Sequence, residues 1–192
     1  MNRNYVGEAM TKNIEIEFKT VLSQNKYEEL LKRFNLENNV FKQINYYFDT
    51  DDFELNQKQM VLRIRQKGEY RYKVTMKCQG QQGAFESHVI ITKEQAESMI
   101  ANGFSTQDFF DDIDFFVTFK TSLENYRVST PYMGGILFLD RCIYCGVEDY
   151  EIEYEVNSFD EGKIIFEQFL TEHGIDIVPT RRKSERAFLC RR

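Results

Sequence analysis

The sequence predicts an α+β protein built on one antiparallel sheet that closes into a β-barrel, with a few peripheral helices. About eight segments of the 192-residue chain alternate apolar and charged side chains with the period of two that is typical of strands, and helical periodicity is much rarer. Proline occurs only twice and no Gly/Ser-rich linker interrupts the pattern, which favours a single domain over residues 1–192. A sheet of this size is expected to curl and close, because closure removes its exposed edges.

The first predicted element is a strand over residues 13–22, preceded by a polar lead-in, residues 1–12, that we expect to be flexible. The charged side chains of this strand fall on one face: Glu15, Glu17 and Lys19. Ser23 is a favourable N-cap for a helix that runs to about Phe34. A second strand is expected near residues 40–50.

Two further strands, residues 60–67 and 70–78, are predicted to form a hairpin. Basic side chains share one face of this hairpin: Arg63, Arg65, Arg71, Lys73 and Lys77. Residues 84–91 read as the next strand, with Glu86 and His88 on the same side. The predicted sheet therefore carries a basic face over at least two strands.

A capping box formed by Thr92 and Gln95 predicts a short helix, and Gly103 ends it. Strand pieces at residues 115–121 and 124–130 are expected to form another hairpin. Each piece presents one basic residue: Lys120 and Arg127.

Two long strands follow, at residues 136–144 and 147–156. The first presents Asp140, and the second has a strongly acidic face: Asp149, Glu151, Glu153 and Glu155. Ser158 with Glu161 has the pattern of a second capping box and predicts the start of a helix. The tail contains a basic group, Arg181, Arg182, Lys183 and Arg186, and ends in an apolar segment that we predict to be a short strand, residues 187–190.

The overall composition excludes several classes of protein. Thirty-one acidic against 25 basic residues give a net charge of −6, which argues against binding nucleic acid. The longest apolar runs are far shorter than the roughly 20 residues that span a bilayer, so we expect no membrane association. The N-terminus lacks the apolar region of a secretory signal, so we expect a cytoplasmic protein with reduced cysteines. No pattern in the sequence predicts an oligomeric state.

A charged strand face is most simply a solvated face, since an antiparallel sheet commonly has one side in water. In this chain, however, acidic residues concentrate on some strands and basic residues on others. Carboxylates are hard ligands that suit Mg²⁺ or Mn²⁺, and arginine and lysine side chains bind phosphate oxygens. If both kinds of face line one cavity, the sequence predicts a polyphosphate site bridged by a metal.

The order of these charged motifs resembles the CYTH superfamily, the triphosphate tunnel metalloenzymes, and in particular the small stand-alone CYTH proteins of Gram-positive bacteria. Glu15-x-Glu17-x-Lys19 corresponds to the signature of the family's first strand. The later landmarks follow in the family's order: Leu62-Arg63-Ile64-Arg65, Thr75-Met76-Lys77, Glu86, Arg127, Leu139-Asp140, Tyr150-Glu151-Ile152-Glu153 and Lys183-x-x-Arg186. The resemblance covers nearly the whole chain and implies an eight-stranded antiparallel tunnel.

The resemblance also implies roles for individual residues. The implied metal ligands for Mg²⁺ or Mn²⁺ are Glu15, Glu17, Glu151, Glu153, Asp140 and Glu86. The implied phosphate-binding residues are Lys19, Arg63, Arg65, Lys77, Arg127, Lys183 and Arg186. Glu15, Glu17 and Lys19 are the implied catalytic residues, and Lys19 either orients the attacking water or neutralises the leaving group.

The implied activity is divalent-metal-dependent hydrolysis of inorganic tripolyphosphate, thiamine triphosphate or a nucleoside triphosphate by an activated water molecule. Two alternatives stay open. One branch of the family makes cyclic AMP, so an adenylate cyclase would use the same tunnel. A non-catalytic protein that binds triphosphate or polyphosphate would also keep the basic residues.

Overall fold

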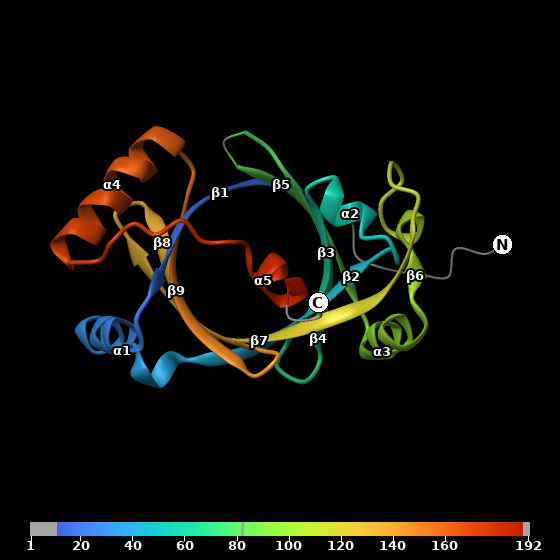
Figure 1. Cartoon of the computed structure of the whole chain (residues 1–192), viewed down its shortest axis with the longest axis horizontal. Helices are drawn as coiled ribbons and strands as arrows, with labels where there is room; N and C mark the ends of the chain where they lie inside the picture. The colour runs from blue at the N-terminus through green and yellow to red at the C-terminus, as the bar shows by residue number, and fades with distance from the viewer. Residues whose placement is uncertain (1–10, 82, 190–192) are drawn as a thin grey trace. The chain divides into compact units, whose positions relative to one another are not determined.

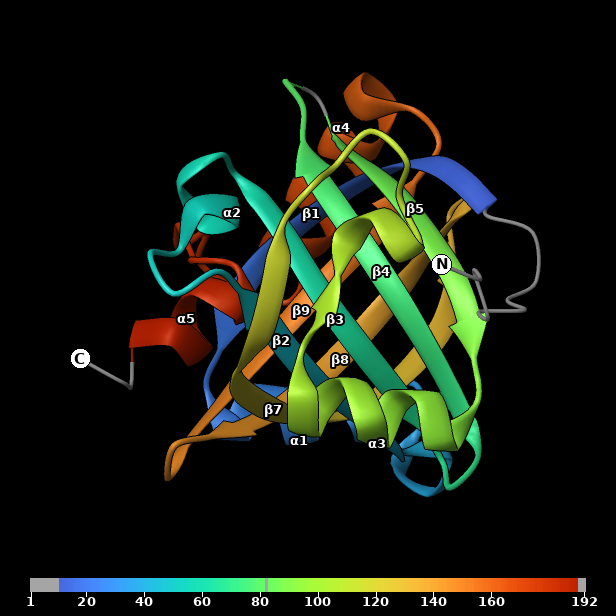
Figure 2. The ribbon, with the colours of Figure 1, turned by 90° about the vertical axis from the view of Figure 1, so that its right-hand side faces the viewer.

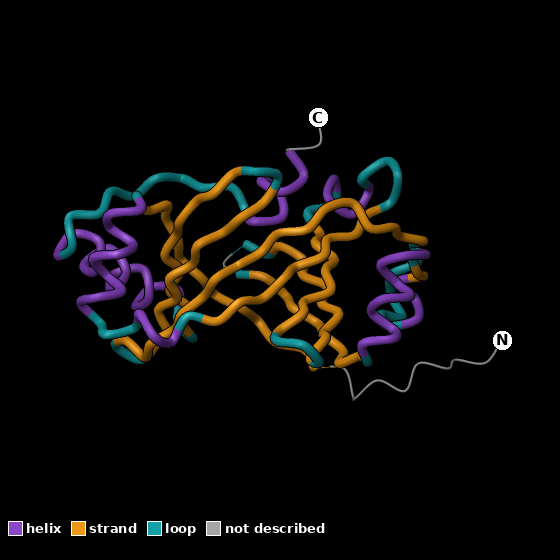
Figure 3. Tube along the Cα trace, turned by 90° about the horizontal axis from the view of Figure 1, so that it is seen from below, coloured by secondary structure: helices purple, strands orange, loops and turns teal. Residues whose placement is uncertain are grey.

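The computed structural model of this chain describes residues 11–81 and 83–189 (Figure 1). Strands, drawn in orange in Figure 3, are more common than helices in the described trace. The strands are β1 (Thr11–Leu22), β2 (Phe41–Asp49), β3 (Met60–Lys67), β4 (Arg71–Gln79), β5 (Ala84–Ile91), β6 (Phe104–Ser105), β7 (Phe116–Tyr132), β8 (Gly135–Tyr144) and β9 (Val147–Val156). The α-helices are α1 (Gln24–Arg33), α2 (Glu54–Gln57), α3 (Lys93–Asn102), α4 (Phe159–Glu172) and α5 (Lys183–Leu189), and short 3-10 turns cover Glu37–Asn39 and Thr106–Asp108.

The strands are hydrogen-bonded in the order β2-β3-β4-β5-β1-β9-β8-β7-β6, and β2 also pairs with β7. That additional pairing closes the row of the eight long strands into a ring, to which the two-residue β6 is attached through β7. The predicted fold class, an eight-stranded antiparallel closed β-barrel with a few peripheral helices, is therefore confirmed.

The chain divides into two compact units, and each has a hydrophobic core of its own. The first unit contains Ile44–Ser122. Its neighbouring antiparallel strands β3, β4 and β5 are seen in Figure 2. One side of this sheet packs with α2 and α3 around fully buried side chains, which include Leu55, Leu62, Ile64, Val74 and Met99. The charged residues alternate with these apolar ones, so they lie on the opposite face of the same strands.

The second unit contains Glu15–Gln43 together with the chain from Leu123 to the end of α5. Helices α1 and α4 pack against β9 and are the purple segments at the left of Figure 3. The core between them contains Leu30, Ile152, Tyr154, Phe166 and Phe169. Because Ile152 and Tyr154 point into this core, the alternating Glu151 and Glu153 of β9 point to the other face.

Two of the three predicted helix caps are confirmed. The side chain of Ser23 accepts a hydrogen bond from the backbone nitrogen of Lys26, and Thr92 with Gln95 forms the predicted capping box. The capping box at Ser158 is wrong, because the Ser158 side chain makes no capping hydrogen bond. Helix α4 nevertheless begins at Phe159, where the backbone nitrogen of Gly162 donates to the Ser158 carbonyl oxygen.

Three other predicted boundaries differ from the structure. The hairpin expected at residues 115–130 is one continuous strand, β7, because no glycine or proline interrupts residues 116–130. The strand predicted at residues 187–190 is wrong up to Leu189, which belongs to helix α5, and Cys190 lies outside the described residues. The expected flexible lead-in lies mostly outside the described residues, but β1 already begins at Thr11.

Of the cysteines that the structure describes, Cys78, Cys142 and Cys145 are free thiols, in agreement with the prediction of reduced cysteines. Within the described residues no helix is both long and apolar enough to cross a membrane.

Candidate functional site

Three buried carboxylates converge in the second unit. Asp140 of β8 lies opposite Glu151 of β9 in the strand register, and Glu153 is two residues further along the same face of β9. Their exposed fractions are 0%, 1% and 6%. Each offers an oxygen atom within 4.8 Å of the others, and in the described part of the chain no other group of His, Cys, Asp or Glu comes together in this way. We call these three residues the carboxylate cluster.

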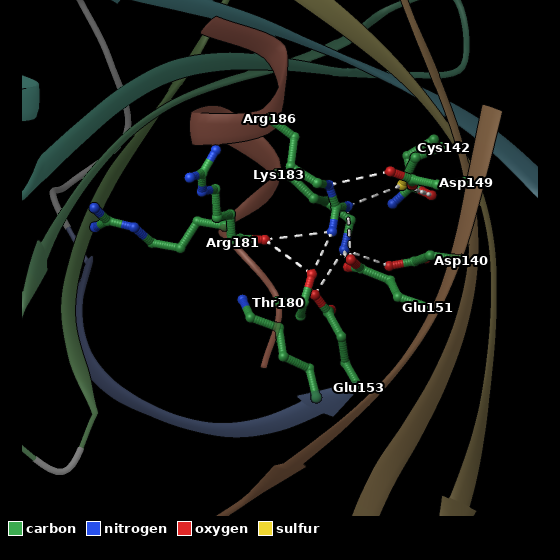
Figure 4. A network of polar contacts seen from close by, with 12 residues as sticks. Asp140, Cys142, Asp149, Glu151, Glu153, Thr180, Arg181, Lys183 and Arg186 are labelled. Atoms are coloured by element: carbon green, nitrogen blue, oxygen red, sulfur yellow. Dashed lines mark hydrogen bonds and ion pairs between the residues drawn. The ribbon is translucent and has the colours of Figure 1, made fainter. Parts of the chain in front are cut away.

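Helix α5 directs two cations at the carboxylate cluster, as Figure 4 shows. The Lys183 Nζ atom lies 2.8 Å from Asp140 Oδ2 and 2.6 Å from Glu153 Oε1, and it also contacts Glu151. Arg186 is one helical turn further on, so both side chains share one face of α5. Its Nη2 atom lies 2.6 Å from the second Glu151 oxygen.

A third cation reaches the cluster from β7. Arg127 donates from Nε to Asp140 Oδ1 at 2.7 Å and from Nη2 to Asp140 Oδ2 at 2.5 Å, which is a bidentate contact, and it also donates to Glu153. Its guanidinium carbon lies 4.3 Å from the centre of the Phe138 ring. The register explains this contact, because Arg127 is directly opposite Asp140 in the β7–β8 pair.

Burial and the neighbouring charges together determine the pKa values of these groups. Burial favours the neutral form of Asp140, but Arg127 and Lys183 outweigh it and hold the pKa of Asp140 well below its usual range. Burial and the neighbouring Glu17 raise the pKa of Glu153. Burial lowers the pKa of Lys183 to about 8, although Asp140 opposes this shift. The cluster therefore contains carboxylates of unequal basicity beside a lysine that loses its proton more easily than an exposed one.

The first strand places Glu17 and Lys19 beside this cluster. Lys19 is directly opposite Glu153 in the β1–β9 pair, and its Nζ atom lies 2.9 Å from Glu17 Oε1. Burial tends to lower the pKa of Lys19, but Glu17 and Glu153 raise it above its ordinary value, so the side chain stays charged. Glu15 is half-buried on the same strand. Neither Glu15 nor Glu17 belongs to the group of three converging carboxylates.

A second charged cluster lies in the first unit, on the charged face of β3, β4 and β5. Arg63 is opposite Thr75, which is opposite His88, and the adjacent row pairs Lys77 with Glu86. Glu86 is almost fully buried and has basic neighbours, Arg63 Nη2 at 3.8 Å and Lys73 Nζ at 3.7 Å. Burial tends to raise the pKa of Glu86, but the surrounding arginines and lysines lower it below its usual value.

Several polar atoms in or beside this second charged cluster make no hydrogen bond among the described residues. They are Arg63 Nε, Thr75 Oγ1, Asn45 Nδ2 and His88 Nδ1. Asn45 is fully buried, and its side-chain oxygen accepts a 2.8 Å hydrogen bond from Arg65 Nε, which fixes the direction of that guanidinium. Buried donors without partners are uncommon in proteins, so they mark this face as a candidate anion site.

Substitution of Thr75 tests whether its buried hydroxyl lacks a hydrogen-bond partner. A buried hydroxyl without a partner costs roughly 1–3 kcal/mol, so we expect T75V to increase the free energy of unfolding by about 1 kcal/mol in urea denaturation. Thr20 is the matched control, because it is also fully buried, donates to the Asp176 carbonyl oxygen at 3.0 Å and accepts from the Val178 nitrogen at 2.8 Å. T20V should lower the free energy of unfolding. Equal losses of unfolding free energy in T75V and T20V would contradict the assignment of the Thr75 hydroxyl as unpartnered.

The structure thus groups the predicted site residues into two sets. The second unit brings together Lys19, Glu17, Arg127, Asp140, Glu151, Glu153, Lys183 and Arg186. The first unit brings together Arg63, Arg65, Lys77 and Glu86. Sequence reasoning did not single out Asn45 or Lys73 as site residues. The alternation of side chains in β4 placed Lys73 on the basic face, so the sequence could have indicated it. Nothing in the sequence indicated Asn45, because its role depends on the hydrogen bond from Arg65.

A family model described as the CYTH domain matches residues 13–188. The chain belongs to the CYTH family. A protein of Bacillus subtilis (strain 168) named "Putative triphosphatase YjbK" is 33% identical to this CYTH protein, and the match covers 91% of this chain and 94% of the relative.

Solved structures agree with this membership. A "putative adenylate cyclase" from Bacillus halodurans is 32% identical to this CYTH protein, with a TM-score of 0.84 over 92% of this chain and 98% of that one. A "putative adenylyl cyclase" from Hippeastrum, described as having a dominant triphosphatase activity, is 21% identical, with a TM-score of 0.73 over 92% of this chain and 94% of that one. The second likeness supports the fold alone.

The donor chemistry of the carboxylate cluster fits a divalent cation. Carboxylate oxygens are the ligands that Mg²⁺ and Mn²⁺ prefer, and the three residues offer converging oxygens from two adjacent strands. One oxygen, Glu151 Oε2, is buried and accepts no hydrogen bond, although Arg186 lies within ion-pair distance. The cluster of this CYTH protein is therefore a candidate metal centre.

Proposed function

We propose that this CYTH protein hydrolyses a triphosphate in a reaction that requires Mg²⁺ or Mn²⁺. The observation that carries the proposal is the carboxylate cluster, Asp140, Glu151 and Glu153, because buried converging carboxylates suit a divalent cation and a phosphate substrate supplies the remaining ligands. The name of the Bacillus subtilis relative, "Putative triphosphatase YjbK", at 33% identity, supports the same activity. The substrate we propose is inorganic tripolyphosphate, thiamine triphosphate or a nucleoside triphosphate.

The residues of the chain have distinct roles in this proposal. A bound divalent cation would neutralise phosphate charge and activate water. The carboxylate cluster would hold that cation, with Glu15 and Glu17 of β1 contributing from the neighbouring strand and Glu86 holding its basic neighbours in place.

The cationic residues would bind the phosphate oxygens and stabilise the charge that develops during transfer. In the first unit these are Arg63, Arg65 and Lys77. Lys19 stays charged beside Glu153, and so it is suited to orienting the attacking water or neutralising the leaving group.

The decisive assay measures phosphate release from tripolyphosphate, thiamine triphosphate and ATP with Mg²⁺ or Mn²⁺. We expect release from at least one substrate and none after chelation with EDTA. The name of the Bacillus halodurans relative favours adenylate cyclase as the second candidate, and cyclic AMP with pyrophosphate from ATP would establish that activity instead. Binding of tripolyphosphate without any product would show a non-catalytic protein.

Arg63 provides a test of the phosphate-binding role. R63A should raise the KM for tripolyphosphate about 10- to 100-fold, with a smaller change in kcat, because a charge-assisted hydrogen bond contributes roughly 1.5–3 kcal/mol. The matched control is R71A, since Arg71 is exposed at the start of β4. A similar KM for R63A and R71A would remove Arg63 from the phosphate site.

A further inference from the structure

The ammonium group of Lys183 lies where the oxygens of the carboxylate cluster converge. Its Nζ atom is 2.8 Å from Asp140 Oδ2 and 2.6 Å from Glu153 Oε1, and it contacts Glu151 as well (Figure 4). These are the same three residues whose oxygens lie within 4.8 Å of one another. A single cationic group therefore already contacts all three residues of the carboxylate cluster.

A metal ion and this ammonium group exclude each other from that position. Mg²⁺ binds oxygen ligands at about 2.1 Å, so an ion held by Asp140 and Glu153 would lie next to the present Nζ atom. Two cations that close repel strongly in a buried environment, where the effective dielectric constant is low. Either the metal or Lys183 can be bound to these oxygens.

The charges around the cluster balance without a metal. Three carboxylates, Asp140, Glu151 and Glu153, face three cations, Arg127, Lys183 and Arg186, of which Arg186 also contacts Asp149, with its Nε atom 3.2 Å from Asp149 Oδ2. A divalent cation added to this set would leave an excess of two positive charges. A divalent cation that takes the place of the two α5 cations would keep the balance.

We propose that Lys183 and Arg186 of α5 are an internal substitute for the divalent cation, and that metal binding displaces Lys183 from Asp140 and Glu153. This inference rests on the proposed function, because it takes the carboxylate cluster as the metal site. The two α5 cations keep the buried carboxylates paired in the metal-free protein, which avoids the large cost of a buried unpaired charge.

This exchange couples binding of the metal to binding of the triphosphate. Metal alone binds weakly, because it has to break the ion pairs that Lys183 makes. The displaced ammonium group then needs a new anionic partner, and a triphosphate is one. Metal and triphosphate therefore bind with positive cooperativity, and each raises the affinity for the other by the same factor.

Calorimetric titration of Mn²⁺ into the full chain without any phosphate tests the exchange. K183M removes the competing charge and should bind Mn²⁺ roughly tenfold more tightly than the wild type, the effect expected for one charge-assisted contact. K183R keeps a cation and should stay close to the wild type. K163M is the surface control, because Lys163 is an exposed residue of α4.

Hydrogen exchange on the wild-type chain gives a second measurement that does not depend on the folding of K183M. The backbone amides of Lys183–Leu189 should exchange faster when Mg²⁺ is added. Equal Mn²⁺ affinities in folded K183M and wild type, or slower exchange of α5 with Mg²⁺, would overturn the inference and leave the proposed function intact. Absence of Mn²⁺ binding to every variant, with tripolyphosphate present as well, would overturn both.

Discussion

E153Q is expected to reduce Mg²⁺-dependent phosphate release from tripolyphosphate by at least about 100-fold, the scale of losing one preorganised electrostatic contact at a reacting phosphate. Glutamine keeps the shape of the side chain but loses the negative charge that a divalent cation needs. Glu153 is almost fully buried and contacts both Lys183 and Arg127. The measurement is kcat at saturating Mg²⁺.

The matched control for this variant is E148Q, on the same strand, because Glu148 is exposed. E148Q should keep wild-type kcat. Thermal unfolding should show that E153Q is folded at the assay temperature. Full activity in folded E153Q would remove Glu153 from the proposed metal site, whatever the substrate.

R127M is expected to lower the free energy of unfolding by about 3–5 kcal/mol at pH 7, more than any other variant considered, because it removes one of the two cations that contact buried Asp140 and Glu153. Arg127 makes the bidentate contact to fully buried Asp140 and also contacts Glu153. Urea denaturation measures the effect. The double variant R127M/D140N should recover part of the loss, because asparagine needs no counter-ion, and equal stability of the single and double variants would contradict the pairing.

The same pair sets a pH dependence with a definite sign. The folded-state pKa of Asp140 lies below its usual range, so ionised Asp140 contributes stability above its unfolded pKa of about 3.9 and loses it as the pH falls further. The difference in unfolding free energy between wild type and R127M should therefore be largest near neutral pH and shrink below about pH 4. A difference that grows on acidification would contradict the assignment.

Much of the fold followed from the alternation of side chains. The spans predicted for β3 and β5 agree with the structure, and β9 has the predicted acidic face because Ile152 and Tyr154 alternate into the core. Local sequence patterns were less informative where contacts with other parts of the chain decide between helix and strand. The short apolar run after Arg186 suits a strand as well as a helix, and its described part, up to Leu189, is helical in the structure.

The candidate site was predictable as a set of residues but not as a set of contacts. Spacing of two in β9 placed Glu151 and Glu153 on one face, but only the register shows that Asp140 lies opposite Glu151. Nothing in the sequence indicated that Lys183, which was expected to bind phosphate, contacts the carboxylates. Contacts of this kind join residues far apart in the chain, and no local pattern encodes them.

The balanced set of three carboxylates and three cations also restricts how this sequence can change over evolution. Loss of Asp140 alone would leave an excess of positive charge, and loss of Lys183 alone would leave an excess of negative charge. We expect mutations at these positions to be strongly epistatic, so that tolerated changes occur in opposite-charge pairs. In family members that no longer bind a metal, we expect a carboxylate and the cation that pairs with it to be replaced together.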